Sequence, residues 1–258
     1  MKTIRYGLFA LCVLCNFLTI KAQENNHSDI RFMTFNIHHG ADIDGDLDLE
    51  RVGNVISEYE PDILALQEVD RKTKRVGGRD LSIELGCETG MTALFGKAIN
   101  YAGGQYGLAV LTKYLVIKSE VHKLPHVPSA EQRVAMEVVL ELPSGDTIRV
   151  INAHLSHKSD SLRTAQFEYV KQLVNDGVPT LLAGDFNAYP EEVNATMPEW
   201  TMADQHHRFT FPSIDPEAKI DYILSWPEEQ WQVKQTLVIG RPEASDHLPL
   251  TAVLQLKK

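Results

Sequence analysis

Short apolar runs rich in β-branched residues recur along the chain at the length of β-strands. Apolar residues spaced three and four positions apart mark the segment 49–59, behind Asp48, and the segment 162–173, and they predict amphipathic helices there. Pro190, followed by two glutamates, is typical of the first turn of another helix. The runs that predict strands are Ile30–Asn36, Ile63–Val69, Leu108–Thr112, Ala135–Leu142, Ile148–Leu155, Thr180–Gly184, Ile220–Ser225, Gln235–Ile239 and Pro249–Leu256. About nine strands and three or four helices favour two packed sheets with helices outside them, although chain order alone leaves the strand pairing open.

The N-terminal segment has the order of a secretory signal peptide. Lys2 and Arg5 precede an uncharged run over residues 6–20, and Ala22 offers a small residue for cleavage. A membrane anchor is the alternative, but the run is shorter than the roughly 18–20 residues that a bilayer requires. We therefore predict a signal peptide at 1–22, export to the periplasm or the extracellular space, and a mature chain without a transmembrane segment.

Beyond residue 22 the composition is even, without a linker or a repeat, and predicts one domain at 23–258. The formal net charge of −10 becomes −13 once the three basic residues of the leader are removed. Because a chain this acidic has no overall attraction for a phosphate backbone, nucleic-acid binding would need a local basic patch. Two of the three cysteines fall in the leader, so Cys87 has no partner for a disulfide within the mature chain. We expect a monomer stabilised by its apolar core.

Several predicted strands end in a polar residue that a buried strand does not need. Singly, each such residue has a structural explanation, such as a turn acid, an Asx-turn or a core histidine. Together they supply the oxygen ligands, the titratable groups and the neutral hydrogen-bond partners that suit a Mg²⁺-like ion and a phosphate, whereas zinc prefers thiolates or clustered imidazoles. The residues are Asn36, Gln67, Glu68, His154, Asp185, Asn187, Asp221, Asp246 and His247.

The sequence strings around these residues resemble the endonuclease/exonuclease/phosphatase superfamily. The strings are Thr34–Ile37, Leu66–Val69, Gly184–Asn187, Ile220–Tyr222 and Ser245–Pro249, in the order of the family and across essentially the whole mature chain. The resemblance implies an α/β protein of the α+β type. Its expected form is a four-layer α/β/β/α sandwich, in which two facing mixed β-sheets are flanked by helices and the site lies at one rim. It also implies hydrolysis of a phosphoester that depends on Mg²⁺ or Mn²⁺.

The resemblance also implies roles for individual residues. It implies a metal site formed by Asn36, Glu68 and Asp246. The catalytic residues that it implies are His154, Asp185, Asn187, Asp221 and His247. In these roles Asp185 and Asn187 position the attacking water and the phosphoryl oxygens, His154 contacts the phosphate, and Asp221 orients the ring of His247. The general base is left open between His247 and Asp185.

Three further residues are candidates for substrate binding. Arg133 falls where relatives place an arginine that contacts phosphate, or is a surface arginine. Tyr106 follows a glycine-rich strand entry and is expected to approach the substrate. Arg75 ends the basic run 71–75, which is either a flexible cationic lip for an anionic group or a solvated loop.

The histidine pairs are less informative. His38 stands where apurinic endonucleases carry an acidic or amide residue, which argues against cleavage at abasic sites. His38 and His39 either line the pocket or belong to an ordinary loop, the pair at 206–207 is expected to be exposed, and His154 with His157 is too little for zinc. We therefore expect in-line attack of water on a small-molecule phosphoester or a lipid head group. A secreted nuclease and a catalytically inactive binding domain are the alternatives.

Overall fold

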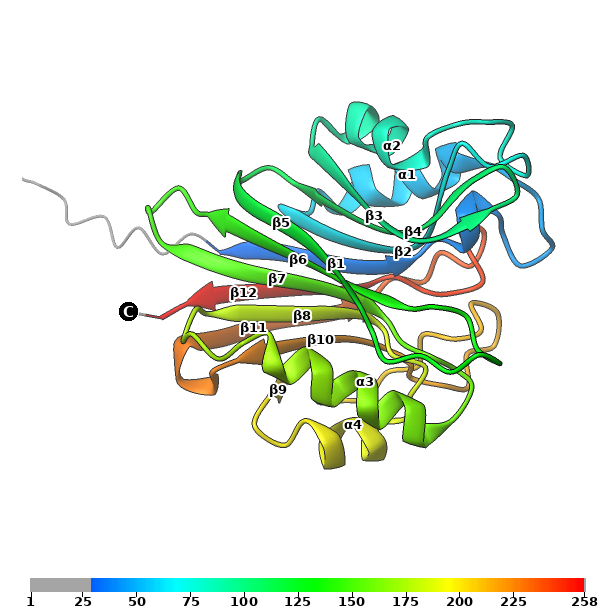
Figure 1. Cartoon of the computed structure of the whole chain (residues 1–258). Helices are drawn as coiled ribbons and strands as arrows, with labels where there is room; N and C mark the ends of the chain where they lie inside the picture. Colours follow the sequence, from blue (N-terminus) through cyan, green and yellow to red (C-terminus); the bar gives the residue numbers. More distant parts are fainter. Residues whose placement is uncertain (1–28, 258) are drawn as a thin grey trace, which may run out of the picture.

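The computed structural model describes residues 29–257 of the 258-residue chain, and the predicted signal peptide lies outside them. Two six-stranded sheets face each other (Figure 1). The first sheet contains β1 (Ile30–Asn36), β2 (Ile63–Arg71), β3 (Thr92–Tyr101), β4 (Gly104–Thr112), β11 (Trp231–Val238) and β12 (Leu250–Leu256). The second contains β5 (Leu115–Lys123), β6 (Val134–Glu141), β7 (Thr147–His154), β8 (Thr180–Asp185), β9 (Thr201–Met202) and β10 (Asp221–Trp226).

Both sheets are mixed. The first has the strand order β11-β12-β1-β2-β4-β3 and the second the order β5-β6-β7-β8-β10-β9. One parallel pair lies inside each sheet, β1 with β2 and β7 with β8, and the other neighbours are antiparallel. The two facing sheets predicted for an α/β sandwich are thereby confirmed.

The helices cover the outer faces of the two sheets (Figure 1). Helices α1 (Leu49–Tyr59) and α2 (Leu81–Thr89) share an apolar cluster with β1, β2 and β4. Helices α3 (Asp160–Gln172) and α4 (Pro190–Thr196) share another with β7, β8 and β10. Two short 3-10 turns, η1 (His38–Gly40) and η2 (Glu228–Gln230), complete the elements of the described chain. Among residues 29–257, no helix combines the length and the apolarity needed to cross a bilayer.

The central strands are almost continuously apolar because both of their faces are buried. In β1, Ile30 and Phe32 belong to the cluster between the sheets, whereas Met33 and Phe35 belong to the cluster under α1 and α2. Successive side chains of a strand point to opposite faces, so this alternation assigns every position of the strand to one side. The central strands of both sheets coincide with apolar runs that were predicted to be strands from the sequence.

Besides the two 3-10 turns, four elements of the described chain were not predicted: β3, β5, β9 and α2. Strand β3 is an edge of the first sheet, β5 and the two-residue β9 are the edges of the second, and most residues of β5 are exposed. An exposed edge strand has no continuous apolar run, so its sequence resembles a loop. Helix α2 turns only a narrow stripe, which includes Leu81 and Leu85, toward the sheet, and this stripe is too short to show a clear period.

Candidate active site

Asn36 links the two sheets at the rim of the sandwich. It is the last residue of β1, and its buried Nδ2 lies 3.0 Å from Oδ2 of Asp185, the last residue of β8 in the opposite sheet. The same nitrogen lies 3.4 Å from Oε1 of Glu68 and 3.4 Å from Nε2 of His247. Four side chains from distant parts of the sequence therefore meet around one amide group.

Strand alternation explains why most of these side chains face one another. Asn36 has the same parity as Ile30 and Phe32, which lie between the sheets. Three polar residues of the second sheet have the parity of neighbours that also belong to this inter-sheet cluster, and these are His154, Asp185 and Asp221. Each strand thus continues its inter-sheet face to the rim, where the apolar residue gives way to a polar one.

Glu68 is the exception, because alternation alone would turn it toward the helices with Leu64 and Leu66. A β-bulge between Leu66 and Val69 breaks the register of β2 with β4, and Glu68 has a left-handed backbone with φ of 58°. Bulges re-aim side chains in this way next to functional sites. The bulge brings the carboxylate of Glu68 beside Asn36.

Two buried amides that the sequence analysis did not assign secure this bulge. Gln67 Nε2 donates to Asn152 Oδ1 across the sheet interface at 2.7 Å. Asn152 Nδ2 in turn lies 2.8 Å from the carbonyl oxygens of Leu66 and Ala109, which form the last pair in register before the bulge. The only sequence signal for Asn152 is its polarity within the apolar run that forms β7.

His247 and Asp221 form a buried pair. Nδ1 of His247 donates to Oδ2 of Asp221 at 2.9 Å, which leaves Nε2 facing Asn36 and Asp185. Burial alone would lower the pKa of His247, but the attraction and the hydrogen bond of Asp221 and the charge of Asp185 raise it to about 10. The structure therefore places Asp221 where it fixes the orientation of the His247 ring.

His154 and Arg133 lie on the other side of Asp185. An arginine can only donate, so Nδ1 of His154 accepts from Arg133 at 3.1 Å and the ring proton lies on Nε2, 3.3 Å from Asp185 Oδ2. Burial, with help from Arg133, lowers the pKa of His154 well below its usual value, so the ring is neutral. Burial raises the pKa of Asp185 to about 7, against the opposing charge of His247.

Asn187 and Asp246 complete the predicted set at its edges. The backbone N–H of Asn187 donates to Asp185 Oδ1 at 3.0 Å, and its side chain donates to the carbonyl of Leu155 at 3.1 Å. Asp246 is about a quarter exposed, and its Oδ1 accepts from Ser245 Oγ at 3.2 Å and lies 3.9 Å from His38 Nδ1.

Arg75 and Tyr106 line a small cavity beside Glu68. The cavity has a volume of about 140 Å³ and also contacts Ile99, Tyr101 and Glu131. The guanidinium of Arg75 is held by both oxygens of the buried Asp70, at 2.6 and 2.8 Å, and lies over the rings of Tyr101 and Tyr106. Arg75 is therefore oriented by the fold.

Of the two alternatives for the basic run 71–75, the ion pairs of its arginines favour an ordered loop over a flexible cationic lip. Arg71 pairs with Asp80 at 3.0 Å, Arg75 pairs with Asp70, and the following Arg79 pairs with Glu84 at 2.6 Å. The loop folds back on itself, since the N–H of Lys72 donates to the carbonyl of Arg79. Neighbouring acids thus neutralise the arginines of this loop.

Three groups of side chains among residues 29–257 have the spacing that a metal ion requires: one, Glu120, His122 and Glu137, lies on β5 and β6, and two lie at the rim described here. His38, His39 and Glu68 form one group, and the other contains Asp185, Asp221 and His247. In each group the potential ligand atoms lie within 4.8 Å of one another. Asp221 Oδ1 is buried without a hydrogen-bond partner in the described part of the chain, and so is His39 Nδ1. Burial, together with Arg75, lowers the pKa of His39 to about 4, so this ring is neutral at pH 7.

Comparison with known proteins identifies the family. A model of the "Endonuclease/Exonuclease/phosphatase family" matches residues 33–247, a span that includes every residue of the site. The chain belongs to this family. Its members are generally phosphoester hydrolases, and the fold described above is that of a phosphoesterase of this family.

Known relatives and solved structures agree with this family. The protein YbhP of Escherichia coli strain K12 is 30% identical over 183 residues, which are 63% of this chain and 68% of YbhP. A family structure from Beutenbergia cavernae has 25% identity and a TM-score of 0.74, covering 88% of this chain and 72% of the other. The mannosyl-6-phosphatase Bt3783 of Bacteroides thetaiotaomicron shares the fold, with 16% identity, a TM-score of 0.71, and coverage of 87% and 99%.

Proposed function

We propose that the protein is an exported hydrolase of phosphoesters that uses Mg²⁺ or Mn²⁺ and acts on a small or lipid-linked substrate. The observation that carries this proposal is the meeting of Asn36, Glu68, Asp185 and His247 at the rim, where groups from both sheets converge on one amide. Export rests on the pattern of residues 1–22, and N-terminal sequencing of the protein from a periplasmic or culture fraction tests it.

The residues present suit a hard divalent cation. Glu68 and Asp246 offer carboxylate oxygens, which are the donors that Mg²⁺ and Mn²⁺ accept. Asn36 turns its Nδ2 toward Glu68 while its Oδ1 accepts from the N–H of His38, so in this arrangement it orients the carboxylate of Glu68. A cation held by these residues would neutralise the charge of the phosphate and of the oxygen that leaves.

Asp185 and His247 are the proton-transfer pair. Their nearest atoms, Asp185 Oδ2 and His247 Nε2, lie 3.8 Å apart, a separation that leaves both groups facing the same point at the rim. With a pKa of about 7, Asp185 can take the proton of the attacking water, while Asp221 stabilises the imidazolium form of His247 that faces the same point. Proton transfer of this kind typically accelerates a reaction by about 10²- to 10⁴-fold.

His154 holds a donor toward the phosphoryl group. Its Nε2–H is fixed by the bond that Arg133 makes to Nδ1, and it lies beside Asp185. A donor that is oriented before the reaction stabilises negative charge without a reorganisation cost, and losing one such donor typically costs roughly 3–4 kcal/mol.

The electrostatics favour a compact substrate over a nucleic acid. Acids pair with Arg71, Arg75 and Arg79, so Lys72 and Lys74 are the cations of this loop that remain without a salt bridge to any described residue, a smaller positive charge for a polymer backbone than the basic run suggests. The adjoining cavity of about 140 Å³ is lined by Tyr101 and Tyr106, whose rings suit the ring or head group of a small ester. The name of the structural neighbour from Bacteroides thetaiotaomicron, a mannosyl-6-phosphatase, is consistent with this class.

A substrate panel tests the proposal. Purified protein is assayed with sugar phosphates, inositol phosphates, sphingomyelin, an aryl phosphodiester, supercoiled plasmid and single-stranded DNA, each with Mg²⁺, with Mn²⁺ and with EDTA. We expect hydrolysis of a small or lipid ester that EDTA abolishes and that Glu68→Gln lowers, whereas the exposed control Glu199→Gln behaves as wild type. Cleavage of DNA alone supports the nuclease alternative, and a lack of turnover on every substrate supports an inactive binding domain.

A further inference from the structure

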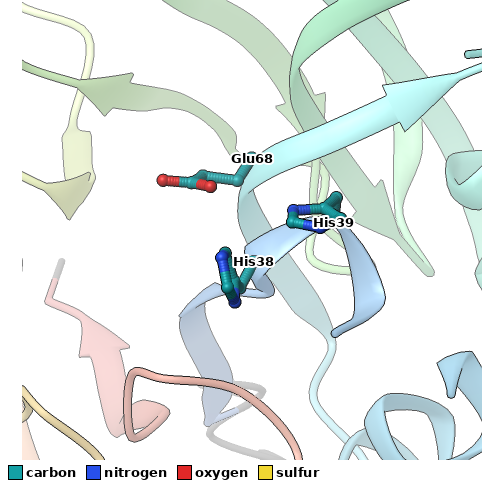
Figure 2. Close-up of side chains that lie close together, drawn as sticks. All are labelled: His38, His39 and Glu68. Atoms are coloured by element: carbon teal, nitrogen blue, oxygen red, sulfur yellow. The ribbon is translucent and has the colours of Figure 1, made fainter. Parts of the chain in front are cut away.

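His38 and His39 lie against Glu68 at the edge of the proposed site. The two histidines begin the turn η1 that follows β1, and Glu68 lies at the bulge of β2 (Figure 2). Each of the three offers an atom that can bind a metal, and these atoms all lie within 4.8 Å of one another. The two imidazole rings are packed edge to face, with their centres 4.5 Å apart.

Each of the two rings keeps one nitrogen without a hydrogen-bond partner within residues 29–257. Nδ1 of His38 lies 3.3 Å from the carbonyl oxygen of Asp42, so the ring proton lies on Nδ1 and Nε2 keeps its lone pair. A bond of this kind from the second ring nitrogen is typical of histidines that bind metals. Nδ1 of His39 is buried and has no hydrogen-bond partner among the described residues, a situation that is costly unless another group occupies the position.

The backbone holds all three residues in an uncommon conformation. The φ angles of His38, His39 and Glu68 are 43°, 47° and 58°, in the left-handed region that residues other than glycine seldom adopt. Such a backbone is strained and persists where the surrounding structure requires it, most often at functional sites. Here the shared result is that two imidazoles and one carboxylate are gathered at one place.

We propose that His38, His39 and Glu68 form a second metal position, next to the oxygen-rich one, and that it takes a nitrogen-binding divalent ion such as Zn²⁺, Co²⁺ or Mn²⁺ in preference to Mg²⁺. Imidazole ligands suit these transition metals, whereas Mg²⁺ prefers oxygen ligands alone. Oε1 of Glu68 faces Asn36, so one carboxylate serves both positions. The inference rests on the proposed function only in that it shares Glu68 with the catalytic metal site.

Direct detection of nitrogen at a bound ion tests the proposal without a substrate. Protein loaded with Mn²⁺ is examined by electron spin echo envelope modulation, which detects ¹⁴N of a coordinated imidazole, and Zn²⁺ and Mg²⁺ affinities are measured by titration calorimetry. We expect ¹⁴N couplings and tighter binding of Zn²⁺ than of Mg²⁺. The double variant His38→Asn with His39→Asn should lose these couplings and bind Zn²⁺ at least about a hundredfold more weakly, since even the partner of a metal-bound histidine contributes about 10- to 100-fold.

Asparagine suits these positions because it tolerates the left-handed backbone better than most residues, and unfolding curves check that the variant is folded. The matched control replaces the other adjacent pair, His206 and His207, by asparagine, and should leave both readouts unchanged. The lack of ¹⁴N couplings in the wild type would overturn the inference whatever the variants do, and so would couplings that persist in the double variant. Hydrolysis with Mg²⁺ in the same preparations separates this failure from a failure of the proposed function.

Discussion

Asn152→Leu removes the amide that bridges the two sheets beneath Glu68, with little change in side-chain volume. The carbonyl oxygens of Leu66 and Ala109 each lose a donor at 2.8 Å, and Gln67 loses its bond to Asn152. A buried polar group left without its partner typically costs about 1–3 kcal/mol. Two carbonyls therefore predict a loss of about 2–6 kcal/mol, while Gln67 keeps its contacts with Thr34 and Ala65.

Urea unfolding followed by circular dichroism measures this loss as the change in the free energy of unfolding. Asn194→Ala, on the exposed face of α4, is the control and should change the free energy by no more than about 0.5 kcal/mol. A loss below about 1 kcal/mol for Asn152→Leu would show that the bulge carbonyls find other donors, and would refute the reasoning.

The same variant should also impair hydrolysis, although Asn152 lies beneath the site. Without the amide, the bulge relaxes and the carboxylate of Glu68 moves from its place beside Asn36. Because a displacement of about 1 Å can cost about a hundredfold in rate, we expect kcat/KM to fall by roughly ten- to a hundredfold at temperatures where the variant is fully folded. If the variant is destabilised but keeps the wild-type kcat/KM, the geometry of the bulge does not control the reaction rate.

At saturating metal, Glu68→Gln and His247→Ala should each lower turnover at least about a hundredfold while the circular dichroism spectrum stays unchanged. Near-wild-type turnover in either variant would contradict the assignment of that residue to the active site. Lys219→Met should cost roughly 1–3 kcal/mol of unfolding free energy in urea, because it removes the buried cation 3.3 Å from the carboxylate of Asp204 and leaves only the partly exposed Arg208 as its ion-pair partner. Burial alone would raise the pKa of Asp204, but the charge of Lys219 and the hydrogen bonds to Asp204 lower it. Wild type should therefore be more stable than Asp204→Asn above the ordinary aspartate pKa of about 4, and this advantage should disappear as the pH falls through the lower pKa of Asp204 in the folded protein. Urea unfolding of both proteins at pH 7 and at pH 3 measures the difference. Cys87→Ser should leave activity and stability within error, because this thiol is exposed.

The amino-acid sequence groups Asn36, His154 and Asp185 because each is a polar residue at the end of an apolar run. Which face of each strand lies between the sheets is known only from the structure, since both faces are apolar, and this face explains why the three side chains converge. The run itself is recognisable because both faces are apolar. Edge strands such as β5 lack this property, since one face meets water.

Contacts between residues far apart in the chain were out of reach of such patterns. The bond of Asn152 to the carbonyl of Leu66 joins residues 86 positions apart, and neither residue marks the other in the sequence. The pairing of Arg71 with Asp80 depends on a loop that folds back, so a basic run counted along the chain overstated the charge that a substrate meets. Apart from the adjacent His38, nothing in the sequence marked His39 as a site residue, because its left-handed backbone conformation is a property of the fold.

The polar contacts at the interface fix the relation of the two sheets more sharply than the apolar core does. Apolar packing is non-directional, so the inter-sheet cluster alone would tolerate small sliding of one sheet on the other. The bonds from Asn36 to Asp185 and from Gln67 to Asn152 are directional and buried, and sliding by one residue would break both. Since Asn36 belongs to the first sheet and Asp185 to the second, the bonds that set the docking of the sheets also set the distance between the catalytic groups. A change that loosens the interface therefore reaches the site even when it lies well away from it.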